Sequence, residues 1–209
     1  MPRRIVGAVE VDIRGMVLAK DIKELREKTG AGIADVKKAL EESGGDAAKA
    51  ELWLERNLGS VAVKKASRET KAGVIEMYLH SNGRISSMVE LFCETDFVAR
   101  NQDFKKLAHD LAMHIAATSP LYVSLDSVPA SAWDAEKIRF EEEVAKMDKP
   151  ENIKNNIVSG KLKTHFGGLS LLSQPFVKDE DRAVGDIVNE AIGRFGENIK
   201  VGRFARFEI

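Results

Sequence analysis

The sequence predicts an α+β protein, in which an N-terminal three-helix domain precedes an α+β core whose small antiparallel sheet is packed with helices. Three observations predict this class: short helical patterns closed by glycines, an alternating pattern around Asn82-Gly83, and later helical patterns followed by a last alternating segment. A length of 209 residues allows one or two domains. The expected organisation is an extension over 1–19, the three-helix domain over 20–58, a basic linker over 59–71, and the core over 72–209.

The composition argues against several classes of protein. Lys and Arg number 32 against 33 Asp and Glu, so the net charge of -1 creates no global field that attracts nucleic acid or anionic membranes. The single cysteine, Cys93, excludes an intrachain disulfide and fits a reducing compartment, so we expect a cytoplasmic protein. No stretch approaches the roughly 18 consecutive apolar residues of a membrane span. Charged residues also interrupt the apolar stretch after Arg3-Arg4, which argues against a signal peptide, and we expect the extension to be disordered.

Three short helices are expected in the N-terminal domain, over 21–29, 33–42 and 47–58. Glycine ends a helix easily because it adopts the left-handed conformation, and glycines follow all three helices, at Gly30, Gly44-Gly45 and Gly59. Asp46 is a candidate N-cap of the third helix. A bundle of this size is near the lower limit for independent folding, which favours a recognition module.

The predicted linker is basic and lacks strong periodicity; its cations are Lys64, Lys65, Arg68 and Lys71. A basic run of this length is usually solvated. Contact with nucleic acid is the alternative, although no aromatic side chain lies between the charges to stack on bases.

Alternation begins at Gly73 and predicts a β-hairpin. Ile75, Met77 and Leu79 share one face, and Asn82-Gly83 marks the turn, because both positions of the common two-residue turn require a positive φ. The second strand, over 85–95, carries apolar residues on both faces. We therefore expect it to be central and covered on both sides.

Asp96 and Phe97 lie where this strand gives way to a helix that Asn101 caps and that runs to about Thr118. Phe97 belongs to neither the strand pattern nor the helical pattern. It either fills the gap between sheet and helix or is an exposed binding hot spot.

Glu94 and Asp96, two apart on a strand, are either solvated acids or ligands of a divalent ion.

The remaining chain predicts three more helices and a final strand. The helices are expected over 130–147, over 151–166 after Pro150, and over 184–195 with a stop near Gly196. The final strand is expected to join the hairpin in an antiparallel sheet. Its strict alternation places Phe204 on one face and, on the other, Ile199, Val201, Arg203, Ala205 and Phe207.

Signatures of enzymes are largely absent. The four histidines show no metal-ligand spacing with Cys93, whose side chain points toward packing, where a thiol stays protonated. The chain contains no Gly-x-x-x-x-Gly-Lys loop and no Gly-x-Gly-x-x-Gly after a strand, so it is not expected to bind a nucleotide itself. We expect a protein that is not an enzyme, with no catalytic residues, no cofactor and no metal site.

Several separate motifs, in the right order, resemble those of bacterial elongation factor Ts, the family of nucleotide exchange factors that act on the GTPase elongation factor Tu. The resemblance covers about residues 21–209. Its motifs are LREKTGAG at 25–32, DVKKAL at 35–40, ETDFVARN at 94–101, AMHIAA at 112–117, QPFV at 174–177 and GENI at 196–199.

The resemblance implies a ubiquitin-associated-like domain over 20–58 that docks on the GTPase domain of the partner, and a core that loosens GDP from it. It implies that Asp96 and Phe97 reach into the partner beside its magnesium and phosphate site, with Phe97 between partner helices. The partner-binding residues that it implies are Leu25, Lys37, His80, Thr95, Asp96, Phe97, Val98, Asn101, Phe195 and Gly196.

The chain also departs from the family pattern. HFGGL at 165–169 stands where a Lys- and Glu-rich helical run is usual, Gly202 where Arg is favoured, and Phe195 where a smaller aliphatic residue is usual. The second core repeat and the helical hairpin of longer members are expected to be missing, so the chain resembles the short forms that work as homodimers. Ala205 stands where some short forms have a cysteine, so the expected homodimer is noncovalent.

Two other functions remain open. The three-helix domain alone is compatible with an adaptor that binds peptides or ubiquitin-like proteins. An RNA-binding translation protein is the other alternative, with contacts from Lys64, Lys65, Arg68, Lys200, Arg203 and Arg206.

Overall fold

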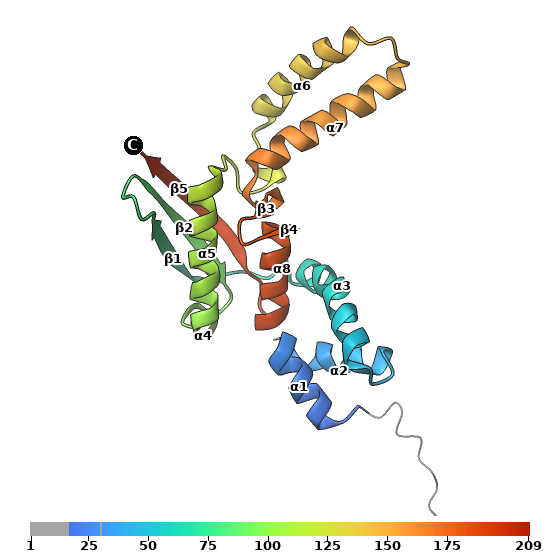
Figure 1. Ribbon diagram of the computed structural model, residues 1–209, viewed down its shortest axis with the longest axis vertical. Helices are drawn as coiled ribbons and strands as arrows, with labels where there is room; N and C mark the ends of the chain where they lie inside the picture. The colour runs from blue at the N-terminus through green and yellow to red at the C-terminus, as the bar shows by residue number, and fades with distance from the viewer. Residues whose placement is uncertain (1–16, 30) are drawn as a thin grey trace, which may run out of the picture.

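The computed structural model describes residues 17–29 and 31–209, apart from the side chains of 55, 56, 58–61 and 63. Its class is α+β, as predicted (Figure 1). The helices are α1 Ala19–Thr29, α2 Ile33–Glu42, α3 Ala47–Lys65, α4 Asp96–Ala99, α5 Gln102–Thr118, α6 Ala130–Ala145, α7 Glu151–Leu169 and α8 Val184–Phe195. The strands are β1 Ala72–Leu79, β2 Ile85–Cys93, β3 Pro175–Phe176, β4 Asp179–Ala183 and β5 Lys200–Glu208. The disorder expected for the extension concerns mainly residues 1–16, which lie outside the described residues, as does the helix stop at Gly30.

The N-terminal domain has a small apolar core of its own, formed by α1, α2 and the first half of α3. Its buried residues are Leu25, Ala31, Val36, Ala39, Leu40, Ala50 and Leu54. The predicted cap of α3 is confirmed, because Asp46 Oδ1 accepts hydrogen bonds from the amides of Ala48 at 3.0 Å and Lys49 at 3.1 Å. Capping and a narrow apolar stripe together explain why these short segments are helical.

Helix α3 continues past Gly59 to Lys65, so the predicted helix end was wrong, and residues 59–65 of the predicted linker are helical. A glycine inside a helix costs only about 1 kcal/mol relative to alanine, and packing outweighs that cost here. The second half of α3 lies against α8, and Ala62 is buried in the main core. One helix therefore belongs to the cores of both parts of the protein.

The main sheet is antiparallel with the order β1-β2-β5, so β2 is central, as predicted. The turn between β1 and β2 differs from the expected type, because only Gly83 of the Asn82-Gly83 pair has a positive φ, of 66°. The Gly83 amide donates to the His80 carbonyl at 2.8 Å, and Asn82 Oδ1 accepts from the Arg84 amide at 2.9 Å. Asn82 thus stabilises the turn through its side-chain hydrogen bond, and its own backbone does not adopt the positive φ that was expected.

A β-bulge in β5 overturns the predicted alternation of that strand. Val89 pairs with Phe204, but Leu91 pairs with Val201, so two steps along β2 correspond to three along β5. The extra residue shifts the two-residue period by one position. Val201 and Phe204 therefore both pack against the core, whereas Arg203, Ala205 and Phe207 are exposed.

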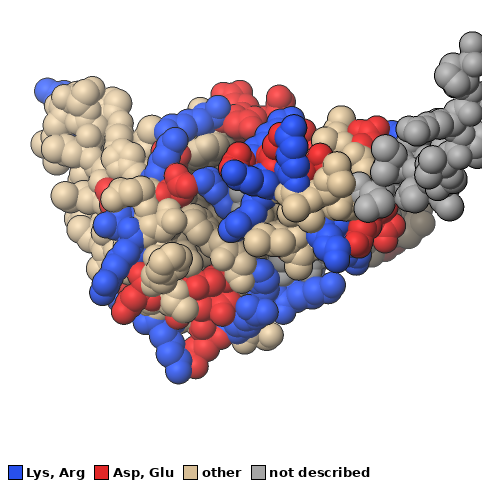
Figure 2. All heavy atoms as spheres, turned by 90° about the horizontal axis from the view of Figure 1, so that it is seen from below, with Lys and Arg blue, Asp and Glu red and all other residues tan. Residues whose placement is uncertain are grey.

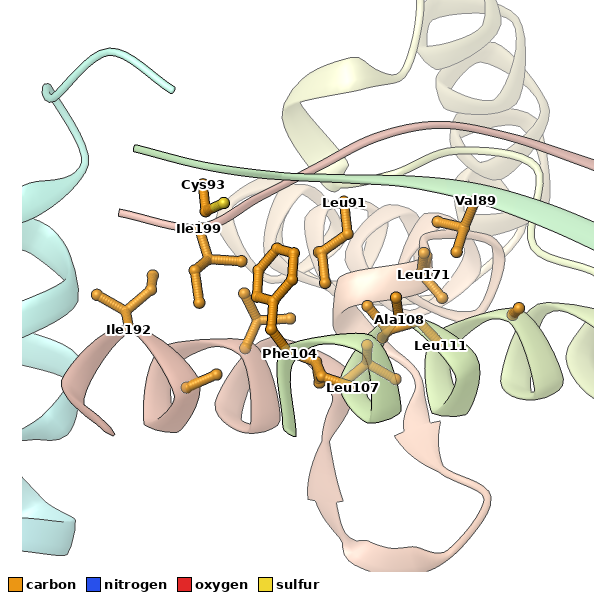
Figure 3. Close-up of a cluster of buried hydrophobic side chains, with 14 of the residues drawn as sticks. Val89, Leu91, Cys93, Phe104, Leu107, Ala108, Leu111, Leu171, Ile192 and Ile199 are labelled. Carbon is orange, nitrogen blue, oxygen red and sulfur yellow. The ribbon is translucent and has the colours of Figure 1, made fainter. Parts of the chain in front are cut away.

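The core lies on the inner face of the sheet. Helix α5 packs against β1 and β2, and side chains of α8 complete the cluster (Figure 3). Phe104 from α5 lies between Leu91 on the strand side and Ile192 on the helix side in this view. Both helices lie where the sequence predicted them, and each buries one apolar face in this cluster.

The outer face of the sheet is uncovered in the described chain, so the expectation that β2 is covered on both sides was wrong for a single copy. No described helix packs on this face, and six large apolar side chains there are 37–69% exposed. They are Ile75, Met77, Leu79, Met88, Phe92 and Phe207.

Helices α6 and α7 form a hairpin that projects from the core (Figure 1), so the expected absence of a helical hairpin was wrong. The hairpin has its own apolar cluster, with Phe140, Val144, Val158, Leu162 and Phe166 buried. Trp133 stacks on Phe166, with ring centroids 4.8 Å apart. These contacts hold the two helices side by side after the break at Pro150.

Candidate partner-binding site

The segment after β2 forms a one-turn helix, α4, that periodicity did not predict. Val98 and Ala99 are buried in the core with exposed fractions of 4% and 6%, whereas Phe97 is 84% exposed. Asp96, the first residue of the turn, is also exposed. Phe97 therefore does not fill the gap between sheet and helix, and the structure leaves it available as a binding hot spot.

The residues that flank Asp96 and Phe97 shape the turn. Thr95 is the N-cap of α4, with its Oγ1 3.5 Å from the amide of Val98. Asn101 is the N-cap of α5, as predicted, and its Oδ1 accepts from the Asp103 amide at 2.8 Å. Thr95, Val98 and Asn101 thus hold the backbone, while the side chains of Asp96 and Phe97 point to solvent.

His80 lies at the opposite end of the sheet from Phe97. It follows β1 at the hairpin turn, where its Nδ1 is 3.1 Å from Tyr78 Oη, while α4 follows the far end of β2. A strand rises about 3.3 Å per residue. Strand β2 has nine residues and therefore separates the two positions by roughly 30 Å. The structure does not bring His80 and Phe97 into one contact patch.

Phe195 and Gly196 lie at the C-terminal end of α8. The half-buried Phe195 ring packs edge to face on Phe104, with centroids 6.0 Å apart. Gly196 has a φ of 73° and caps α8, its amide donating to the Ile192 carbonyl at 3.0 Å. This left-handed conformation strains any residue with a Cβ, so Gly196 has a backbone role that a surface contact does not require.

Leu25 and Lys37 lie in different environments. Lys37 is exposed on α2 and pairs with Glu41 at 3.7 Å. Leu25 is only 3% exposed and belongs to the core of the N-terminal domain. Its side chain supports the domain and does not reach the surface.

Sequence reasoning missed Glu197, although this residue lies in the GENI motif. Its carboxylate accepts hydrogen bonds from the Glu94 amide, the Thr95 amide and Thr95 Oγ1, at 3.1, 3.0 and 2.6 Å. The position after a helix-ending glycine was the available signal. Its partners are far away in the sequence and could not be inferred from spacing.

Cys93 and His114, two side chains capable of catalytic chemistry, are buried and occupied by packing contacts. Burial, together with the charge of Glu197, raises the pKa of Cys93 to about 11, so the thiol is protonated at neutral pH. Burial lowers the pKa of His114, whose Nε2 is 3.0 Å from Gln174 Oε1 and whose Nδ1 accepts from the Val177 amide at 3.3 Å. A neutral imidazole that donates through Nε2 satisfies both contacts.

Metal binding and membrane insertion find no support in the described part of the chain. Glu94 accepts a hydrogen bond from the Asn198 amide at 2.6 Å and lies 3.4 Å from Arg68, so its carboxylate has protein partners. Across residues 17–29 and 31–209, no group of three His, Cys, Asp or Glu side chains could hold a metal ion. None of the described helices combines the length and apolar character that a bilayer span needs.

Three of the six basic residues of the RNA-binding alternative, Arg68, Arg203 and Arg206, pair with acidic side chains. Arg203 pairs with Glu90 at 2.5 Å, and Arg206 pairs with Glu208 at 2.6 Å. Figure 2 shows Lys and Arg side chains interspersed with Asp and Glu over the lower end of the molecule. Interspersed charges give a weak net field, whereas RNA binding depends on a basic patch.

Comparisons of the sequence with family models and with known proteins point to the same family. A sequence model of the family described as Elongation factor TS matches residues 17–209. Elongation factor Ts of Thermotoga petrophila is 50% identical over 188 residues, which cover 90% of this chain and 94% of the relative. The Oleidesulfovibrio alaskensis protein of that name is 49% identical over 193 residues, covering 92% and 98%, and that of Herpetosiphon aurantiacus is 47% identical over 188 residues, covering 90% and 95%. With nearly its whole described length matched in this way, the chain belongs to the elongation factor Ts family.

Proposed function

We propose that this protein is the guanine nucleotide exchange factor of elongation factor Tu and acts in translation elongation in the cytoplasm. The observation that carries the proposal is Phe97, a large apolar ring that is 84% exposed on a turn anchored by buried Val98. Exposed aromatic side chains on a fixed backbone are typical hot spots of protein interfaces. Phe97 enters between helices of the partner, and Asp96 approaches its magnesium and phosphate site.

The proposed mechanism is coupling between two binding equilibria. If the factor binds nucleotide-free partner more tightly than the GDP-bound form, GDP must weaken binding of the factor by the same ratio. Disturbing the geometry that holds the partner's magnesium ion weakens the binding of the GDP phosphates. Each ~1.4 kcal/mol removed from the barrier to GDP release speeds release about tenfold. This mechanism requires no covalent step by the factor.

Release of a fluorescent GDP analogue from elongation factor Tu tests the proposal. The nucleotide is chased with excess GDP, with and without this protein, and stopped-flow fluorescence gives the rate. We expect the rate to rise with factor concentration and then to saturate, because a ternary complex forms before release. A rate that stays at the intrinsic value at all factor concentrations contradicts the proposal.

We also propose that the N-terminal domain has a ubiquitin-associated-like fold and docks on the GTPase domain of the partner. Lys37 is exposed on α2 and available for such a contact. Leu25 is buried, so it supports the binding surface by packing in the core of the domain. Helix α3 packs on α8 of the core. This continuity favours one binding unit that includes Phe97 over an adaptor that uses the N-terminal domain alone.

A noncovalent homodimer is the third part of the proposal, with the outer face of the sheet as its interface. The described chain contains one three-stranded sheet, and the outer face of this sheet exposes six large apolar side chains. Ala205, at the position where some short members of the family have a cysteine, is exposed on the same face. A second copy would cover this apolar surface, which water otherwise contacts unfavourably.

Charge introduced at the centre of this face is expected to separate the dimer. Met77 is 61% exposed and lies opposite Met88 on the neighbouring strand. In light scattering we expect the wild type at twice the mass of one chain and Met77→Asp at the mass of one chain, because burying an unpaired carboxylate is costly. Ile138→Asp is the matched control, since Ile138 is 58% exposed on α6, and it is expected to stay dimeric. A monomeric wild type, or a dimeric Met77→Asp, rules out this interface.

A further inference from the structure

A hydrogen-bonded cluster around Glu197 fastens the N-terminal side of α4. Glu197 Oε2 accepts from the amides of Glu94 and Thr95 at 3.1 and 3.0 Å, and Oε1 accepts from Thr95 Oγ1 at 2.6 Å. Hydrogen bonds to an ionised acceptor are about twice as strong as those between neutral groups. The left-handed turn at Gly196 delivers the glutamate from the end of α8. The cluster thus joins two segments that are far apart in the sequence.

Helix α4 needs such support because it is too short to be stable alone. It has four residues, and the first turn of a helix is unfavourable to nucleate. The hydrogen bond from the Val98 amide to the Thr95 cap is long, at 3.5 Å. Phe97 is 84% exposed, so its own side chain gains little packing from the rest of the chain. The direction of the ring therefore follows the backbone of the turn.

We infer that Glu197 is a positioning residue that sets the orientation of Phe97 by holding Thr95, an inference that rests on the proposed exchange function. Buried Val98 and Ala99 anchor the turn after Phe97, and Glu197 anchors it before. With both sides held, the backbone at Phe97 is fixed, and the side chain leaves it in one direction toward the partner. Less conformational freedom is lost on binding when a contact is preorganised in this way.

The same cluster extends to the chain segment that follows α3. Glu94 Oε1 accepts from the Asn198 amide at 2.6 Å, and Asn198 Nδ2 donates to the carbonyls of Arg68 at 2.7 Å and Ala66 at 3.4 Å. Asn198 is only 2% exposed. The segment leaving the N-terminal domain and the turn with Phe97 are therefore held at one point of the core.

Amide hydrogen exchange of the isolated protein tests the positioning without any partner. The Ala99 and Arg100 amides bond to the carbonyls of Thr95 and Asp96, at 3.2 and 3.1 Å, and report on the turn. We expect Glu197→Ala to speed their exchange about tenfold or more, because local opening becomes easier. Glu197→Gln keeps an oxygen for the two amides and is expected to stay close to wild type. Glu180→Ala, at an exposed glutamate on β4, is the matched control and is expected to change nothing.

GDP release from elongation factor Tu then tests the consequence. We expect Glu197→Ala to lower the maximal stimulated rate about tenfold, which corresponds to ~1.4 kcal/mol. The half-saturating concentration is expected to change less, because the other contact surfaces remain. Glu197→Gln is expected to restore most of the rate. In a Phe97→Ala background, Glu197→Ala is expected to add little, because both substitutions remove the same interaction.

The outcomes separate this inference from the proposed function. Unchanged amide exchange in Glu197→Ala overturns the positioning role, and so do fully additive losses in the double variant, which indicate a direct contact of Glu197 with the partner. If the wild type fails to stimulate GDP release, the proposed function falls. Amide exchange alone then decides whether Glu197 holds the turn.

Discussion

Replacing Phe97 with alanine is expected to lower the maximal stimulated rate of GDP release from elongation factor Tu by about 30-fold while the fold stays intact. Truncating an aromatic hot spot costs about 2 kcal/mol or more of binding energy, and 2 kcal/mol corresponds to about 30-fold in rate. The ring is 84% exposed, so few intramolecular contacts are lost. Stopped-flow release of a fluorescent GDP analogue at saturating factor measures the effect.

Leu121→Ala is a suitable control for Phe97→Ala, because Leu121 is another large apolar side chain, 65% exposed. We expect this control to release GDP at the wild-type rate. Circular dichroism of both variants verifies the fold. A folded Phe97→Ala with the full wild-type rate shows that the ring is not inserted into the partner, whatever the other surfaces contribute.

Phe104→Ala is expected to lower the free energy of unfolding by about 3–5 kcal/mol, the usual cost of emptying a buried phenylalanine site. Phe104, on α5, is fully buried in the core cluster with residues of β2 and α8 (Figure 3). Its ring packs edge to face on Phe195. Such a loss is a large part of the roughly 5–15 kcal/mol that stabilises a typical domain. The midpoint of urea unfolding measures it.

Phe97→Ala is the matched control for this experiment, because it is the same chemical change at an exposed position. We expect it to shift the free energy of unfolding by no more than about 0.5 kcal/mol. Both variants are compared at one protein concentration, since dimerisation would add a concentration-dependent term. A loss below about 1 kcal/mol for Phe104→Ala would show that the core is not organised around this ring.

Helix ends were predicted correctly where capping residues within a few positions decide them. The prediction failed where packing against a distant part of the chain outweighed the local signal. The caps at Asp46 and Asn101 and the stop at Gly196 all involve hydrogen bonds within a few residues, and all three are present in the structure. Gly59 carries the same signal but lies inside α3. Packing of that helix on α8 decided the outcome, and no pattern within the helix reports on it.

The candidate site was predictable in its location but not in its architecture. The resemblance of the ETDFVARN motif singled out Asp96 and Phe97, and the structure exposes both. It did not show that Val98 is an anchor, that Leu25 is buried, or that Glu197 holds the turn. These roles depend on which face of a short element meets the core.

By itself, the sequence determined the class of the protein, its amphipathic helices, the central place of β2 and the family to which the motifs point. These properties follow from spacing and capping over a few residues, where the backbone and nearby side chains decide the free energy. Only the tertiary structure decided three others: the bulge that turns Phe204 to the core, the continuation of α3 into the core, and the exposure of Phe97. Each depends on a contact between segments far apart in the chain, such as Glu197 with Thr95, and local patterns carry no information about such contacts.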